Sequence, residues 1–185
     1  DPKLQRMLSK YFEYMQVVNK AKLIGGRTFY QEVSCDYRGR IYYAESFLEF
    51  QGSDLARSLF LFANKKEVDE DGFKWMLIHA ANSYNASYSI NELKKIDWLS
   101  TDYIAYLKEE GLETISVDKM TLDDRVKWAK NNISFINDCA RDLAVRSEAE
   151  KPYSFLAVCI EISNCLTSKG PYFSGLPIPI DGSNN

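Results

Sequence analysis

The chain has 185 residues, 45% of them hydrophobic, and a formal net charge of −3. This size suits one packed domain or two small lobes, and no apolar run approaches the roughly 18 to 20 residues of a membrane span. The charge is uneven, because residues 1–40 hold eight basic and four acidic side chains whereas the remainder holds 15 and 22. A mildly acidic total therefore does not exclude nucleic-acid binding by a local basic region, but it argues against nucleic acid wrapping the whole surface.

The N-terminus, DPKLQRMLSK, has no apolar segment of the kind found in signal peptides, so we do not expect secretion. It also lacks an initiator methionine, which favours a fragment or a processed product. The four cysteines form no C-x-x-C pair, and with His79 as the only histidine they make no zinc-ligand set. We expect reduced thiols in a cytosolic or organellar compartment.

Helical signals dominate the chain in order. Apolar residues at three- and four-residue spacing predict an amphipathic helix over about 3–22 that ends at Gly25-Gly26. Short strands are expected at 27–34 and 40–44, on either side of a DYRG turn. Further helices are expected from Ser53 or Asp54 through Phe62, over 69–84, over 89–98, from Ser100 or Thr101 to Gly111, and from Thr121 to about Leu143.

The C-terminal part reads as a buried helix followed by a strand. Pro152 suits the first turn of a helix that runs to about Leu166 and is apolar nearly all round, so we expect deep burial. Leu176, Ile178 and Ile180 then alternate as in a strand, and the intervening prolines place it at a sheet edge.

Two short motifs could carry chemistry, and each has a plain alternative. Asp181-Gly182 follows the apolar alternation, where a carboxylate and a free glycine carbonyl could hold a metal ion, but Asp-Gly is also a common surface turn. In CDYRGR, residues 35–40, arginine forks match phosphate oxygens, Gly39 permits a positive φ, and Asp36 could orient one guanidinium. The alternative for this motif is a hairpin turn with a solvated Asp–Arg pair.

Five ordered blocks resemble the single-subunit, bacteriophage-type RNA polymerases, which also serve mitochondria and chloroplasts. They are DYRGRIYY from Asp36, FQGSDLARSLFLFA from Phe50, GFKWMLIHAAN from Gly72, KPYSFLAVCIEI from Lys151 and LPIPIDGSNN from Leu176. These are similar to the family's D-x-R-G-R-x-Y block, its N-x-x-G-x-D-x-x-R/K-x-L, G-x-x-W-L-x-I-H-x-A-N and P-F-x-F-L-A-x-C-x-E segments, and the L-P-I-x-x-D-G-S that opens catalytic motif A. Because they occur in order over residues 36–185, the resemblance is specific.

The resemblance implies a mainly helical α+β segment, part of the palm of a right-hand polymerase, with short strands around the DxxGR turn and at the catalytic aspartate. Residues 1–26 would be a leading amphipathic helix and 27–63 the DxxGR turn with its following helix. Residues 64–150 would be a helical region with an apparent insertion at about 97–118, and 151–185 a buried helix and the start of motif A.

The resemblance also implies template-directed ribonucleotidyl transfer with two Mg²⁺ ions held by two aspartates. Asp181 matches the first of these aspartates, and Gly182 matches the accompanying main-chain carbonyl contact. Substrates and partners would be a DNA template, nascent RNA and ribonucleoside triphosphates. The fingers helix and the second metal aspartate have no match, so we expect the isolated chain to be inactive. It would be either a fragment or one subunit of a split polymerase, in which a second polypeptide supplies the missing parts.

Four positions match nucleic-acid contacts of the family. Arg38 and Arg40 match the block that grips the backbone, with Arg40 the stronger expectation, and Tyr42 matches the following aromatic. Arg57 matches a basic position on the next helix.

Supporting roles fall to Asp36, Gly39 and Glu161. Glu161 lies in a nearly all-apolar helix, where a buried carboxylate needs a partner, and we expect one of the arginines. His79 in its apolar helix is expected to be a packed core residue rather than a catalyst.

The chain departs from the family at the Asp-Lys pair that normally follows the I-H-x-A-N block. Here the stretch is Asn85-Ala86-Ser87-Tyr88, so Lys94, Lys95 or a partner segment would have to replace that lysine. Phage-infected bacterial cytoplasm and the mitochondrion both fit a reduced, soluble chain. The alternative function is a non-catalytic nucleic-acid-binding or scaffolding subunit that retains the polymerase fold.

Overall fold

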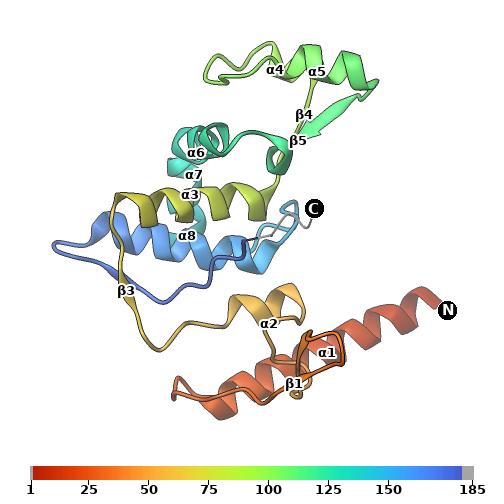
Figure 1. The fold of residues 1–185 in the computed structure, drawn as a ribbon, viewed down its shortest axis with the longest axis vertical. Coiled ribbons are helices and arrows are strands. Elements are labelled where there is room, and N and C mark those ends of the chain that lie inside the picture. The colour runs from red at the N-terminus through yellow and green to blue at the C-terminus, as the bar shows by residue number, and fades with distance from the viewer. Residues whose placement is uncertain (1, 181–185) are drawn as a thin grey trace. The chain divides into compact units, whose positions relative to one another are not determined.

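The computed structural model describes residues 2–180, and the chain divides into two compact units, residues 1–63 and 64–185 (Figure 1). We call them the N-terminal and C-terminal units. The expected α+β, mainly helical class is confirmed: eight α-helices accompany three two-stranded antiparallel sheets in the described residues. No helix of this part of the chain is both long and apolar enough to cross a membrane.

The N-terminal unit consists of one long helix, a hairpin and a short helix. Helix α1 (Pro2–Ile24) ends where Gly25 and Gly26 adopt φ values of 58° and 72°, as the sequence predicted. Strand β1 (Val33–Cys35) pairs antiparallel with β2 (Ile41–Tyr43), with Ser34 opposite Tyr42. Helix α2 (Asp54–Ser58) begins after Ser53, whose hydroxyl accepts from the Ala56 amide.

Helix α2 ends at Ser58 and is shorter than expected, since the helix was predicted to extend through Phe62. Phe60 is only 3% exposed and stacks on Phe50 with ring centroids 4.3 Å apart, whereas Leu61 and Phe62 are exposed. The buried side chains of this unit are Val17, Leu48, Ala56 and Phe60.

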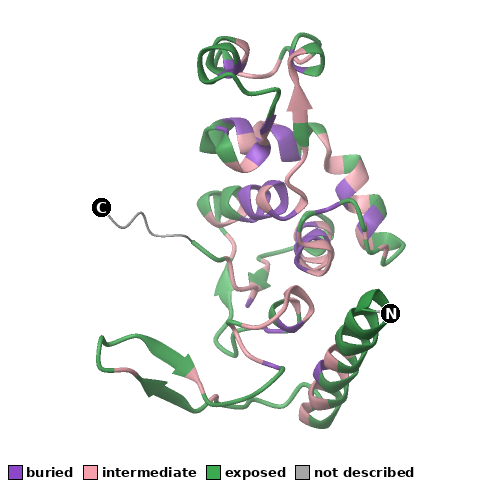
Figure 2. Ribbon diagram, turned by 90° about the vertical axis from the view of Figure 1, so that its right-hand side faces the viewer, coloured by how far each residue is buried: buried purple, intermediate pink, exposed green. Residues whose placement is uncertain are grey.

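The C-terminal unit is built on four packed helices. Helix α3 (Glu70–Tyr84) contacts α6 (Leu122–Asn131) and α8 (Pro152–Thr167), and α7 (Ile133–Arg141) packs on α8. Strand β3 (Lys66–Glu67) pairs antiparallel with β6 (Phe173–Ser174). Figure 2 shows the buried residues concentrated on these helices, while the hairpin and most of α1 are exposed.

The expected helix over 121–143 is interrupted at Asn132, which ends α6 and begins α7. The side-chain amide of Asn132 donates to the Trp128 carbonyl at 2.8 Å, so it competes with the helical backbone pattern. Its backbone adopts φ −104° and ψ 17°, outside the helical region. Thr121, where the sequence predicted this helix to begin, caps α6 by accepting from the Asp124 amide.

Three other predictions in this unit were wrong in detail. Residues 89–98 contain only the short helix α4 (Ile90–Leu93), preceded by strand β4 (Ser87–Ser89). No strand forms over 175–180, because prolines at 177 and 179 lack the amides of a ladder, although Leu176 and Ile178 pack against the core. Helix α8 buries only one face, which includes Phe155 and Ile162, and is half-exposed elsewhere.

The segment expected as an insertion, 97–118, is part of the core. It holds α5 (Tyr103–Glu110), β5 (Thr114–Ser116), which pairs with β4, and the start of a 3-10 helix (Val117–Lys119). Tyr103 and Leu107 are buried, whereas the acidic residues at 109, 110 and 113 are exposed to solvent.

Asp124 fixes this segment to α6. Its side chain is fully buried and accepts from the Ser100 amide and hydroxyl at 3.0 and 2.7 Å, from the Tyr103 hydroxyl at 2.8 Å and from the Thr121 hydroxyl at 2.9 Å. Burial alone would raise the pKa of this carboxyl, but the donors outweigh it and lower the pKa to about 2.

Candidate nucleic-acid interface

The turn between β1 and β2 is organised by Asp36. One carboxylate oxygen accepts from the backbone amides of Arg38 and Arg40, at 2.8 and 2.9 Å. The main chain closes the turn as well, since the Gly39 amide donates to the Asp36 carbonyl and the Asp36 amide to the Arg40 carbonyl, each at 3.0 Å. Gly39 adopts φ 76°, the left-handed region that a three-residue hairpin loop requires.

This geometry corrects one expectation about Asp36. Within the described residues it forms no ion pair with Arg38 or Arg40, because its oxygens serve the backbone of the turn and, at 3.3 Å, the Tyr42 hydroxyl. Asp36 therefore orients the main chain from which both arginines project, rather than holding a guanidinium directly.

The two arginines are exposed at the tip of the hairpin but differ in their surroundings. Arg38 donates from Nε to the Tyr37 hydroxyl at 2.8 Å, and its guanidinium carbon lies 5.1 Å from the Tyr37 ring centroid. No comparable side-chain contact is made by Arg40 among the described residues. The sequence reasoning did not single out Tyr37, although an aromatic residue beside an arginine at a turn was the available signal.

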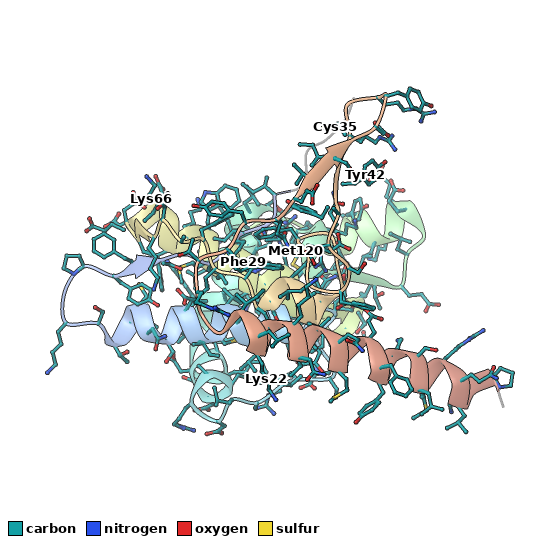
Figure 3. The ribbon with its side chains drawn as sticks, turned by 90° about the horizontal axis from the view of Figure 1, so that it is seen from below. Lys22, Phe29, Cys35, Tyr42, Lys66 and Met120 are labelled. Carbon is teal, nitrogen blue, oxygen red and sulfur yellow. The ribbon has the colours of Figure 1, made fainter. Side chains whose placement is uncertain are left out.

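Tyr42 and Arg57 belong to the same unit as the turn. Tyr42 faces Asp36 from β2 and is 44% exposed; in Figure 3, Cys35 and Tyr42 mark the two strands of the hairpin. Arg57 lies exposed in the last turn of α2, and no hydrogen bond joins it to residues 36–40 in the described part of the chain. The nucleic-acid roles of these residues remain predictions.

Side-chain amides and one ion pair attach the hairpin to its unit. Gln51 donates to the Ile41 carbonyl at 3.1 Å, and Gln31 donates to the Leu48 carbonyl at 2.7 Å. Lys20 on α1 pairs with Glu45, just after β2. These polar contacts therefore hold the hairpin, and with it the turn, against the rest of the N-terminal unit.

In the C-terminal unit, Glu161 supports the chain that follows α8. It accepts from the Tyr172 hydroxyl at 3.0 Å and from the Ser174 hydroxyl at 2.6 Å, and it pairs with no arginine among the described residues of this unit. Its expected pairing with an arginine of the site remains a prediction. The pKa of Tyr172 is raised to about 12, chiefly by burial and to a smaller extent by the hydrogen bond to Glu161. The Leu176 amide donates to Ser174 at 3.0 Å, so Glu161 holds the start of the segment before Asp181.

His79 is a core residue, as predicted. It is 7% exposed on α3, and its Nδ1 lies 3.4 Å from the Ser83 hydroxyl. Asn85, in the stretch that lacks the family's lysine, ends α3 at φ 53° and accepts from the Asp118 amide, which is a structural role. Lys94 and Lys95 are exposed, and their proposed substitution for the missing lysine remains a prediction.

The metal residues expected from the sequence, Asp181 and Gly182, lie outside the described residues. Residues 2–180 contain no group of three carboxylate, histidine or cysteine side chains that could hold a metal ion. All four cysteines are free thiols, as expected, and Cys139 and Cys159 are buried.

Comparison with known proteins places these observations in a family. The family model for DNA-dependent RNA polymerase matches residues 66–185. The mitochondrial DNA-directed RNA polymerase of Neurospora crassa is 30% identical over 171 residues, 89% of this chain and 10% of the relative. DNA-directed RNA polymerase 2, chloroplastic/mitochondrial, of Arabidopsis thaliana is 31% identical over 170 residues, 89% of this chain and 14% of the relative.

The chain therefore belongs to the single-subunit, bacteriophage-type family of DNA-dependent RNA polymerases. It spans between 10% and 14% of the length of the first curated relatives it matches.

Proposed function

We propose that this chain forms the part of a DNA-directed RNA polymerase that runs from the DxxGR block to the start of motif A. In this proposal the turn at residues 36–40 binds the phosphate backbone of nucleic acid close to the active centre. The observation that carries it is the turn itself: Asp36 fixes the amides of Arg38 and Arg40, and both guanidinium groups project into solvent. Arginine presents planar donors that match phosphate oxygens.

The proposed ligands and partners follow from family membership. The chain would work with a DNA template, nascent RNA and ribonucleoside triphosphates. Asp181 and the Gly182 carbonyl would contribute to binding Mg²⁺, which supplies charge neutralisation and activation of the attacking hydroxyl when bound. We propose that the second aspartate and the fingers come from the rest of the polymerase, either in the same polypeptide or in a second one, and we expect no RNA synthesis by the 185 residues alone.

The names of the relatives support a mitochondrial location over phage-infected bacteria. The matched proteins of Neurospora crassa and Nicotiana sylvestris are mitochondrial polymerases by name. We therefore propose transcription in an organelle as the setting of this chain.

The test uses the assembled polymerase, meaning this chain together with the polypeptide that carries the second aspartate. Binding of a fluorescent RNA–DNA hybrid is measured at several KCl concentrations for the wild type, Arg40→Ala and the control Arg6→Ala, whose arginine is exposed on α1. Arg40→Ala should bind more weakly, with a salt slope reduced by about 0.7 to 0.9 for one lost phosphate contact. Equal behaviour of the two variants would mean that Arg40 makes no phosphate contact, and the same result for Arg38→Ala would overturn the phosphate-binding role of the turn.

Primer extension with Mg²⁺ and ribonucleotides then separates the enzyme from the scaffold alternative. Asp181→Ala should abolish incorporation by the assembled polymerase while leaving hybrid binding in place. If incorporation survives, Asp181 is not a metal ligand and the chain acts as a nucleic-acid-binding scaffold. Incorporation by the isolated 185 residues would contradict the expectation that they are inactive without the rest of the polymerase.

A further inference from the structure

Tyr37, at the tip of the hairpin, neither stabilises the turn nor packs in the core. The Tyr37 side chain is 89% exposed, and Asp36 already fixes the backbone on both sides of it. An exposed tyrosine that neither packs nor caps carries no evident structural role. Its contacts are with the guanidinium of Arg38.

These contacts restrict the orientation of Arg38. The hydrogen bond from Nε to the Tyr37 hydroxyl is 2.8 Å long, and the guanidinium carbon lies 5.1 Å from the ring centroid, within the range of a cation–π interaction. Only one of the five N–H donors is used, so both terminal nitrogens remain available. Two parallel donors from terminal nitrogens are the arrangement that binds a phosphate through two oxygens.

We propose that Tyr37 is a positioning residue that holds Arg38 ready to bind a backbone phosphate of the nucleic acid. The proposal rests on the function proposed above and gives the two arginines of the turn different roles. Arg38 is oriented before binding, which lowers the entropy lost when the contact forms. Arg40, which has no such support within the described residues, is ordered only on binding.

A double-mutant cycle in the assembled polymerase tests this role, with a fluorescent RNA–DNA hybrid of mixed sequence as the probe. Tyr37→Leu should weaken binding about two- to fivefold, the size of an exposed cation–π interaction, and Tyr37→Phe, which retains the ring, should lose less. In an Arg38→Ala background, Tyr37→Leu should have no further effect. The matched control is Tyr30→Leu, because Tyr30 is 93% exposed in the same unit.

The cycle also distinguishes positioning from direct base stacking, since exposed aromatic rings can stack on nucleic-acid bases. If Tyr37→Leu weakens binding equally with and without Arg38, the ring contacts the nucleic acid itself and the positioning role is wrong. Amide hydrogen exchange at Arg38 and Arg40 should be unchanged in Tyr37→Leu, because Asp36 holds the turn; faster exchange would instead show a structural role.

The outcomes separate this inference from the proposed function. If Arg38→Ala and Arg40→Ala both bind as the wild type does, the phosphate-binding function of the turn fails. If both weaken binding but Tyr37→Leu does not, the function stands and only the positioning role is overturned.

Discussion

The two units of this chain are stabilised in different ways. The C-terminal unit buries 21 residues in one apolar cluster, whereas the N-terminal unit buries four. A fully buried large apolar side chain contributes about 1.5 to 3 kcal/mol, and ordering one residue costs about 1 to 2 kcal/mol. The four buried residues of the N-terminal unit include one alanine, so apolar burial contributes much less to the stability of this unit than to that of the C-terminal unit.

The same contrast appears in α1. Its apolar pattern was predicted correctly, but the helix does not bury that face: Leu4, Met7 and Tyr11 are 55%, 62% and 59% exposed. Exchange with solvent should therefore be faster throughout the N-terminal unit, because few apolar contacts protect its backbone. The proposed phosphate-binding turn lies in the less strongly packed unit, as binding loops often do.

The largest expected effect is on the packed unit. Phe155 is fully buried on α8 against Tyr84 and Phe135, with ring centroids 5.0 and 6.0 Å away. Phe155→Ala leaves a cavity and should lower the free energy of unfolding of the C-terminal unit by about 3 to 5 kcal/mol. Amide hydrogen exchange of α3 and α8 measures the change.

Phe60→Ala is the matched substitution in the other unit, since Phe60 is 3% exposed and stacked on Phe50. Its effect on exchange should be confined to residues 1–63. If it accelerated exchange in α3 and α8 as much as Phe155→Ala does, the two units would unfold together and the contrast drawn above would be wrong.

The next effect depends on pH and concerns Asp124. Its folded pKa of about 2 lies below the unfolded value of about 3.9, so its stabilising contribution is complete above pH 4 to 5 and is lost as the pH falls toward 2. The contribution is about 2 kcal/mol. Asp124→Asn should destabilise the C-terminal unit by a similar amount at neutral pH and flatten this part of the acid dependence, measured by denaturant unfolding at several pH values.

Asp123→Asn is the control, because its carboxylate is 74% exposed and pairs with Lys74 at the surface. It should change stability by less than about 1 kcal/mol. An equal loss in the two variants would mean that the donors around Asp124 contribute nothing beyond a surface ion pair.

The sequence was informative where local chemistry decides the structure. Gly25-Gly26 ending α1 and Thr121 capping α6 followed from backbone rules that depend on neighbours in the chain. What could not be predicted depended on contacts distant in sequence: Ser100 and Tyr103 converge on Asp124 from 24 and 21 residues away.

The candidate site followed the same rule. The DYRG turn and its hairpin were expected from residue types, because positive φ at Gly39 is a local property. The hydrogen-bond partners of Asp36 could not be predicted from the sequence, since aspartate can accept from either a guanidinium or a backbone amide. The hydroxyl partners of Glu161, Tyr172 and Ser174, were likewise not expected from the sequence, because they come from the chain that follows α8.

A smaller effect is expected from substitution of Gly39, because its backbone conformation, rather than the space around it, disfavours a side chain. A Cβ would meet nothing within 4 Å at Gly39 or at Gly170, but only Gly39 has a positive φ, 76°. Gly39→Ala should destabilise the turn by about 1 to 2 kcal/mol, seen as faster amide exchange at residues 36–40. Gly170→Ala should be neutral or slightly stabilising, and the opposite order would contradict the observed backbone.

The smallest effect should come from the ion pair between Lys20 and Glu45, which links α1 to the segment after β2. Both side chains are more than a third exposed, at 35% and 44%, so water screens their attraction. A double-mutant cycle of Lys20→Ala and Glu45→Ala, read by exchange in β1 and β2, should give a coupling below about 1 kcal/mol that falls at high salt. A larger, salt-independent coupling would show that this pair, rather than the small apolar cluster, holds the hairpin on α1.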